Sequence, residues 1–143
     1  MSLTVTFVRH RERRDRIFVE REDGSQLGWS FPSYGDRLPH DLCHLVVEHA
    51  LGITDGFWGL VERGADVALV DNEATLVRDG TPLVESDVDF SGLLRAEDAV
   101  ALMSGTSGAE VPAGQYESVR ARLSELTEEW CDLDDGGAIT LTF

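Results

Sequence analysis

The sequence contains no lysine, and its 12 basic residues are all arginine. Aspartate and glutamate number 27, so the formal net charge is −15 at pH 7. This shortage of basic side chains argues against general binding to nucleic acids, because phosphate neutralisation needs a basic surface. The composition is typical either of a GC-rich genome's codon bias or of a surface adapted to high salt. Net charge bears on solubility and partners rather than on fold.

Cysteines and long apolar runs are also scarce. Cys43 and Cys131 lie far apart in the chain and form no CxxC pair, so we expect no disulfide framework and a reducing, cytoplasmic setting. No run approaches the ~18 apolar residues of a membrane span, and the first residues lack the basic and long apolar regions of a signal peptide. We therefore expect a cytoplasmic protein that does not bind membranes.

The length of 143 residues and the hydrophobic content of 42% indicate a single globular domain that spans residues 1–143. A chain of this length can bury roughly two-thirds of its unfolded surface, which is enough for a core without disulfide staples.

Strand patterns begin at the N-terminus. Residues 3–8 alternate apolar and polar side chains with period two, and residues 17–21 and 27–31 are also strand-like. Asp23 and Gly24 are a turn signal between the second and third of these runs. The pattern predicts an antiparallel meander of three strands, with a long charged tip between the first two.

Helical patterns occupy much of the rest. Residues 38–52, LPHDLCHLVVEHALG, are the most apolar helix-compatible segment. A second, short helix is predicted over residues 56–64, with Thr54 or Asp55 as its N-cap. Residues 91–103 look helical, and residues 104–114 are typical of a flexible loop. The clearest amphipathic helix spans residues 116–130.

The C-terminal residues 138–143 again alternate with period two and predict a strand that joins the N-terminal sheet. Strands lie at both ends with helices between them, so α+β fits better than a βαβ repeat. We therefore predict an α+β fold in which a small antiparallel sheet, the meander plus the C-terminal strand, is packed by three or four helices. Residues 65–90 fit either short strands or a helix.

One polar stripe runs along the central helix. His40, His44 and Glu48 recur every four residues and share one side of the helix with Asp41. These residue types bind metals or move protons. A solvated helix face is the preferred interpretation, with a metal site or a non-metal acid–base site as alternatives. His49 falls on the opposite side, where we expect it to be partly buried and hydrogen-bonded to backbone.

Residues 40–44, HDLCH, resemble the H-E-x-x-H zinc motif of metallopeptidases, with Asp41 in the place of glutamate. The resemblance implies a zinc cofactor bound by the two histidines, with Glu48 or Glu62 as third ligand and Asp41 as the base. Two departures count against it. Asp41 is one methylene shorter than glutamate, and His40 would lie in the first helical turn, where the macrodipole repels a cation.

A longer stretch, residues 34–65, resembles the core of a family of small, uncharacterised bacterial proteins. The family pattern is LPHDLxHxxVE followed by lGxxdGfWG, and the matching segment here is YGDRLPHDLCHLVVEHALGITDGFWGLVERGA. The resemblance implies no activity, because none is established for the family. It does imply that the polar stripe and the GFWG turn belong to one structural unit.

Two further groups are open to a functional or a structural interpretation. Residues 9–16, RHRERRDR, could contact phosphate. They include two carboxylates in a strongly acidic chain, so a solvated hairpin tip is the preferred interpretation. Five aromatic residues near the central helix could wall a pocket, but aromatic side chains more often pack in the core. They are Trp29, Phe31, Tyr34, Phe57 and Trp58.

Two functions are compatible with these patterns. The preferred one is a non-catalytic cytoplasmic binding or interaction protein of an uncharacterised family, which could form homo-oligomers and binds neither nucleic acids nor membranes. The alternative is a zinc-dependent hydrolase-like enzyme that uses the His40/His44 pair, with Glu48 as a further ligand and Asp41 as the catalytic base. Neither a phosphate loop, a dinucleotide fingerprint nor a GxSxG nucleophile motif occurs in the sequence.

Overall fold

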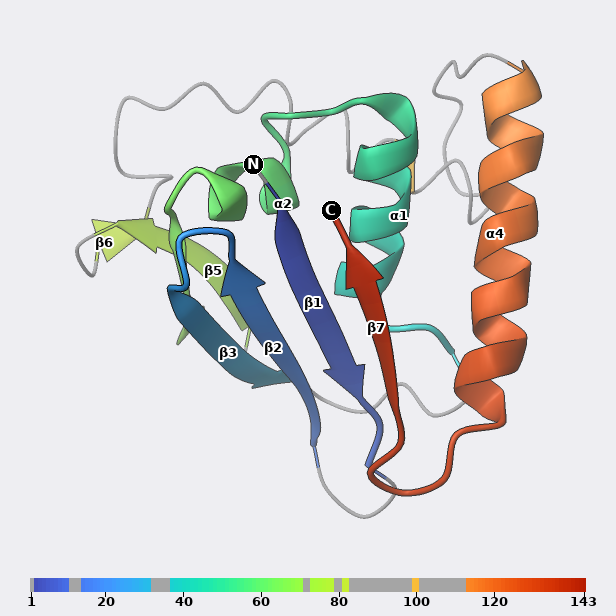
Figure 1. Ribbon diagram of the computed structural model, residues 1–143, viewed down its shortest axis with the longest axis horizontal. Coiled ribbons are helices and arrows are strands. Elements are labelled where there is room, and N and C mark those ends of the chain that lie inside the picture. Colours follow the sequence, from blue (N-terminus) through green and yellow to red (C-terminus); the bar gives the residue numbers. More distant parts are fainter. Residues whose placement is uncertain are drawn as a thin grey trace.

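The fold comes from a computed structural model, which describes residues 2–10, 14–31, 37–70, 73–78, 81–82, 99–100 and 113–143. Its elements (Figure 1) are β1 (Leu3–Val8), β2 (Asp15–Arg21), β3 (Gln26–Phe31), α1 (His40–Leu51), α2 (Phe57–Glu62), β4 (Asp66–Val70), β5 (Glu73–Arg78), β6 (Thr81–Pro82), α4 (Ala113–Cys131) and β7 (Ala138–Thr142). The predicted α+β class is confirmed. The larger sheet is antiparallel, with the order β3-β2-β1-β7, so the meander and the C-terminal strand do form one sheet.

The period-two pattern of β1 sets the inner face of this sheet. Leu3, Val5 and Phe7 are fully buried, while the threonines between them face the other way. Phe7 lies opposite Ile17 of β2 and Ile139 of β7, so the buried positions of three strands are in register. Each such side chain contributes roughly 1.5–3 kcal/mol when it is fully buried.

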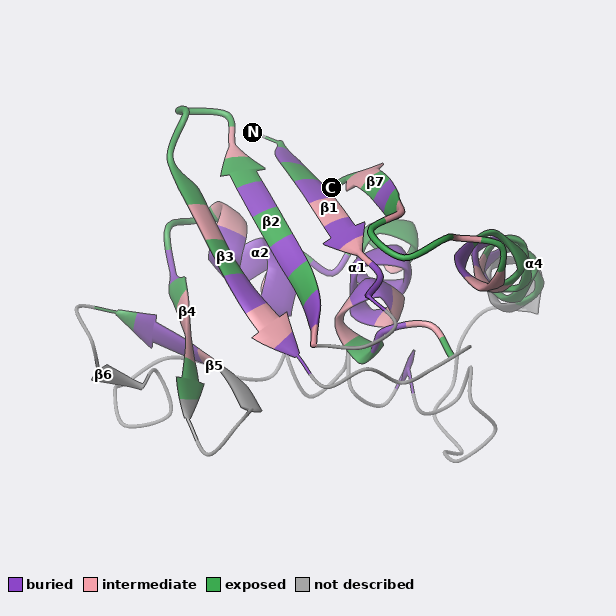
Figure 2. Cartoon of the chain, turned by 90° about the horizontal axis from the view of Figure 1, so that it is seen from below, coloured by how far each residue is buried: buried purple, intermediate pink, exposed green. Residues whose placement is uncertain are grey.

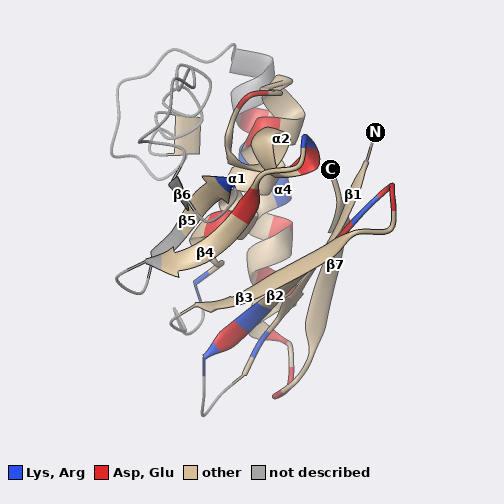
Figure 3. Cartoon of the chain, turned by 90° about the vertical axis from the view of Figure 1, so that its left-hand side faces the viewer, with Lys and Arg blue, Asp and Glu red and all other residues tan. Residues whose placement is uncertain are grey.

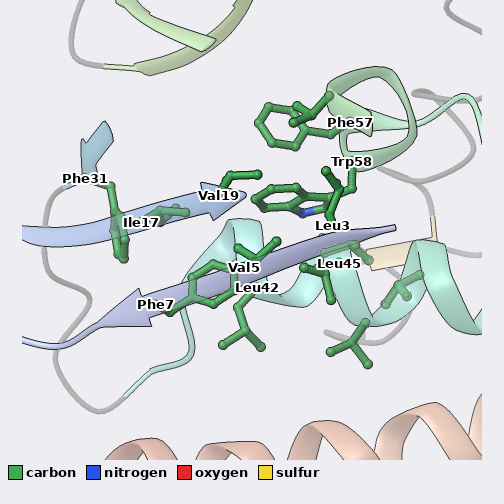
Figure 4. Close-up of a cluster of buried hydrophobic side chains, with 14 of the residues drawn as sticks. Leu3, Val5, Phe7, Ile17, Val19, Phe31, Leu42, Leu45, Phe57 and Trp58 are labelled. Atoms are coloured by element: carbon green, nitrogen blue, oxygen red, sulfur yellow. The ribbon is translucent and has the colours of Figure 1, made fainter. Parts of the chain in front are cut away.

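Helices α1 and α2 cover the inner face (Figures 1 and 2), and none of the described helices packs on the opposite face. Figure 4 shows Leu42 and Leu45 of α1 and Trp58 of α2 gathered around the buried side chains of β1 and β2. Gly52 ends α1 in the left-handed conformation, with a φ of 67°. The central helix predicted for residues 38–52 is thus confirmed.

Helix α4 stands beside α1 at the β7 side of the sheet (Figures 1 and 2). Val119, Leu126 and Trp130 are buried, as the amphipathic pattern predicts. The helix begins at Ala113, so the end of the loop predicted for residues 104–114 is helical instead. The rest of that loop lies outside the described residues.

The helix predicted over residues 91–103 is only partly described. Residues 99 and 100 are helical and buried, and the other residues of this range lie outside the described part of the chain.

A second sheet is the main departure from the predicted fold. Strands β4, β5 and β6 form an antiparallel sheet that contacts β3, and they occupy part of the segment that fitted either strands or a helix. These strands are two to six residues long. Strands β4 and β5 carry adjacent apolar residues instead of a strict alternation, so their sequence does not separate a period of two from a period of 3.6.

The expected solvated tip at residues 9–16 is wrong for three of its residues, because Arg9, His10 and Asp15 are buried. The Asp15 carboxylate accepts a hydrogen bond from the His10 backbone N–H at 2.7 Å. The Arg9 guanidinium donates to the carbonyl oxygen of Trp130 at 2.6 Å, which ties the end of β1 to the end of α4. Residues 11–13 lie outside the described residues.

Charged residues occur on the helices as well as on the strands (Figure 3). None of the helices described by the structure is long and apolar enough to cross a membrane.

Candidate functional site

The second half of the polar stripe of α1 points into the protein, so the expectation of a solvated face is wrong for His44 and Glu48. His44 is 3% exposed and Glu48 is 0% exposed. His40 is exposed and Asp41 is half-buried. The reason is tertiary, because α2 and two tryptophan side chains cover this side of α1.

The Glu48 carboxylate forms the N-terminal cap of α2. It accepts hydrogen bonds from the backbone N–H of Phe57 at 3.2 Å and of Trp58 at 3.0 Å. A third contact joins it to Nδ1 of His44 at 3.1 Å. The first N–H groups of a helix have no partner within the helix, and a negative charge beside them is favourable.

The predicted capping of α2 by Thr54 or Asp55 is wrong. The N-cap residue is Gly56, and it provides no side-chain cap. A Cβ atom at Gly56 would overlap the Glu48 carboxylate, so the absence of a side chain lets the carboxylate reach the helix.

Gly59 has a comparable role one turn later. A Cβ atom at Gly59 would overlap the backbone carbonyl of Thr54. Gly59 lies inside the six-residue helix and disfavours it locally by roughly 1 kcal/mol relative to alanine, and Gly56 is the N-cap residue just before it. Here both permit close packing, and the polar stripe and the GFWG turn are in direct contact through Glu48.

The C-terminal end of α2 has a basic partner. Arg21 of β2 donates to the carbonyl oxygens of Val61 at 2.8 Å and Ala65 at 2.6 Å. A guanidinium at the carbonyl end and a carboxylate at the amide end both match the direction of the helix dipole. Because both partners come from other elements, α2 depends on tertiary contacts for its stability.

The indole groups of two tryptophans complete the cluster. Trp29 and Trp58 stack with ring centroids 5.8 Å apart. Nε1 of Trp58 donates to the backbone carbonyl of Asp41 at 2.8 Å, and Nε1 of Trp29 donates to its carboxylate at 3.3 Å. Trp29, Phe31, Phe57 and Trp58 are buried, which confirms the core interpretation for these four aromatics, and Tyr34 lies outside the described residues.

The metal ligands implied by the H-E-x-x-H resemblance are only partly brought together. The rings of His40 and His44 lie 4.7 Å apart, between centroids. Both Glu48 oxygens already accept amide N–H groups, and Glu62 lies in the last turn of α2, whereas Glu48 contacts the first. Among the described residues, no group of three or more His, Cys, Asp or Glu side chains could hold a metal ion.

His49 is exposed, so the expectation that it is partly buried and bonded to backbone is wrong. Its ring contacts the ring of Phe143 at a centroid distance of 5.9 Å.

A groove that the sequence did not indicate lies between α1, α4 and β7. Its volume is about 520 Å³, which falls within the range of small-molecule pockets. The described lining residues are Leu45, Val46, His49, Ala50, Ser118, Val119, Arg122, Thr140, Leu141 and Thr142. They come from three elements that are distant in the sequence, so no local pattern could reveal the groove.

Cys43, beside the polar stripe, has a perturbed acidity. Burial raises the pKa of its thiol from the ordinary value of 9.0 to about 11, and the negative charge of Asp41 acts in the same direction. The folded protein therefore keeps this thiol protonated at pH values where the unfolded chain has lost the proton.

We expect the free energy of unfolding to fall as the pH rises from 9 to 11, the interval between the unfolded and folded pKa values of Cys43. The unfolded state binds fewer protons in this window, so the loss has a limiting slope of ~1.4 kcal/mol per pH unit and totals about 1–2 kcal/mol. Urea unfolding at several pH values measures it, and the lack of lysine leaves few other groups titrating there. Cys43→Ala serves as the control, and an equal decline in this variant would contradict the assignment.

No family model matches the chain, and neither a curated protein nor a solved structure does.

Proposed function

We propose that the protein is a non-catalytic binding protein that takes an apolar segment of a partner protein into the groove between α1, α4 and β7. The observation that carries this proposal is the groove itself, about 520 Å³ in volume and walled by two helices and a strand. Leu45, Val46, Val119 and Leu141 supply its apolar lining. Sites of this kind combine an apolar surface with a few polar groups that orient the bound segment.

The polar stripe supports a structural rather than a catalytic role for the residues that first suggested an enzyme. Glu48 holds the N-terminus of α2, and Asp41 accepts hydrogen bonds from two indoles. A zinc-dependent hydrolase built on His40 and His44 has less support, because Glu48 already bonds to two backbone amides and to His44, and the described residues bring no group of three potential ligands together.

The charge of the chain favours a protein as the partner. A net charge of −15 repels the phosphates of nucleic acids and anionic lipid headgroups. Both cysteines are free thiols, in keeping with a cytoplasmic location as part of this proposal.

Peptides selected from a random phage-displayed library test the proposal. We expect selected peptides to bind the native protein and to lose at least tenfold in affinity with Ser118→Trp or Ala50→Trp, since each indole would fill the groove from a different wall. Both residues are exposed at the surface of their helices, so the variants should fold.

Ser124→Trp is the matched control, because Ser124 is an exposed serine on the same helix that does not line the groove. Affinities are measured by fluorescence polarisation, and folding is checked by circular dichroism. If all selected peptides bound Ser118→Trp and Ala50→Trp as tightly as the native protein, the groove would not be the binding site.

A further inference from the structure

The groove has the free edge of a β-sheet as one wall. Strand β7 is the last strand of the larger sheet and pairs with β1 on one side. In the part of the chain that the structure describes, no strand pairs with its other side. An unpaired edge offers a row of backbone N–H and C=O groups to a further strand.

The register between β1 and β7 shows which backbone groups of β7 are available to a further strand. Leu3 and Phe143 exchange both backbone hydrogen bonds, at 3.1 and 2.9 Å. Bonded and non-bonded pairs alternate in an antiparallel ladder. The backbone N–H and C=O groups of Ala138, Thr140 and Thr142 therefore point away from β1.

These outward groups open onto the groove. Thr140 and Thr142 are among its lining residues, opposite Ser118, Val119 and Arg122 of α4. Figure 1 shows α4 running alongside β7, with α1 behind the space between them. An extended segment placed there could bond to β7 along one side and pack against both helices.

We propose that the partner binds by strand addition, as an extended peptide of about five residues paired with Ala138–Thr142. This inference rests on the proposed function and specifies how the groove is used. Alternate side chains of the added strand would face the apolar walls formed by Leu45, Val46 and Val119. The preferred peptide therefore alternates apolar and polar residues.

The charge of the lining selects among such peptides. His49 and Arg122 are the ionisable members of the described lining, which includes no carboxylate, although the chain has 27. Arg122 is half-exposed and pairs with Glu125 at 3.4 Å. Surface pairs of this kind are weak, so the guanidinium can also accept a carboxylate from the peptide. The geometry points to a partner segment that is apolar at alternate positions and carries a glutamate or aspartate near Arg122.

The net negative charge of the chain repels an acidic peptide at long range, which opposes the attraction of its carboxylate to Arg122. At physiological ionic strength the Debye length is ~8 Å, so distant repulsion is screened while a direct contact persists. Binding of an acidic peptide should therefore tighten or stay constant as salt rises from 0.02 to about 0.15 M, the range in which screening develops. A site that used acidic groups to bind a basic peptide would weaken instead.

The experiment uses two labelled heptapeptides in which valine and threonine alternate. One threonine is replaced by glutamate in the first peptide and by lysine in the second. Amide hydrogen exchange of the saturated full-length protein is followed by NMR. We expect exchange at Thr140 and Thr142 to slow at least tenfold, with little change at Ile139 and Leu141, which already bond to β1. We also expect Arg122→Glu to weaken the glutamate peptide at least fivefold and to strengthen the lysine peptide.

Arg120→Glu is the matched control, since Arg120 is exposed and lies two positions away on α4, on a different face. A peptide could bind in a way that Ser118→Trp abolishes and yet leave amide exchange at Thr140 and Thr142 fast. This result would overturn strand addition and leave the proposed function standing. No binding of either peptide at millimolar concentration would also overturn it. Concentration-dependent protection of Thr140 and Thr142 without peptide would contradict it as well, because a second copy of the chain would then occupy the edge.

Discussion

Replacing Glu48 with alanine is expected to lower the free energy of unfolding by about 3–5 kcal/mol, because each buried donor left without an acceptor costs ~1–3 kcal/mol and two amides would lose theirs. The carboxylate is 0% exposed and is hydrogen-bonded to the N–H groups of Phe57 and Trp58. Its loss would leave both amides buried without an acceptor, and a typical domain has only about 5–15 kcal/mol of stability in total. Urea unfolding followed by tryptophan fluorescence measures the change.

Two further variants test whether the loss of stability comes from the hydrogen bonds between Glu48 and α2. Glu48→Gln keeps the size of the side chain but turns an NH₂ group toward one amide, so we expect an intermediate loss. Glu129→Ala removes an exposed carboxylate from α4 and should change stability by less than ~0.5 kcal/mol. A loss below about 1 kcal/mol for Glu48→Ala would mean that the carboxylate does not hold α2.

Gly59→Ala is expected to destabilise the protein by about 3 kcal/mol, although alanine normally stabilises a helix by ~1 kcal/mol relative to glycine. The new methyl group would overlap the backbone carbonyl of Thr54, which cannot move without shifting the segment between α1 and α2. The expected effect therefore has the opposite sign to helix propensity. Thermal and urea unfolding both report it.

Gly24→Asn is the control for this substitution. Gly24 occupies the turn between β2 and β3 with a φ of 86°, and a Cβ atom added there would have no neighbour within 4 Å. Asparagine tolerates this conformation, so the cost should stay below ~1 kcal/mol. If Gly59→Ala proved neutral or stabilising, the close approach of Thr54 to α2 would be refuted.

The strands and the two long helices could be predicted because their periodicity is carried by many residues. The residues of β1 alternate strictly, and α4 repeats its apolar positions from Tyr116 to Trp130. The C-terminal strand could also be assigned to the N-terminal sheet. These features follow from patterns within each element.

The second sheet and the caps of α2 could not be predicted, for different reasons. Strands β4 and β5 carry adjacent apolar residues instead of a strict alternation, and β6 has only two residues, so none of them shows a clear period. The partners of α2 are Glu48 and Arg21, which come from other elements, whereas the local sequence favours Thr54 or Asp55 as a cap. Local propensity cannot identify a cap that tertiary structure supplies.

In the candidate site, too, local patterns predicted some features and tertiary structure determined the others. The helical wheel correctly separated His49 from His40, His44 and Glu48. It could not show which side of α1 faces solvent, because a polar stripe on a helix can be solvated or can meet buried polar partners. The groove depends on where α4 stands relative to β7, and that placement has no local sequence signal.

Two roles therefore separate along α1. One side, with Asp41, His44 and Glu48, holds α2 and the tryptophans in place. The other, with Leu45, Val46 and His49, forms a wall of the groove. Substitutions on the first side should change stability, and exposed substitutions on the second should change binding without loss of stability.

Chemical-shift mapping with a peptide selected for binding tests this separation most directly. We predict that the largest amide shift changes lie at Ala50, Ser118, Thr140 and Leu141, around the groove. Changes centred on His40, His44 and Trp58, with the groove unaffected, would contradict the proposed binding site. They would place the functional site on the polar stripe instead.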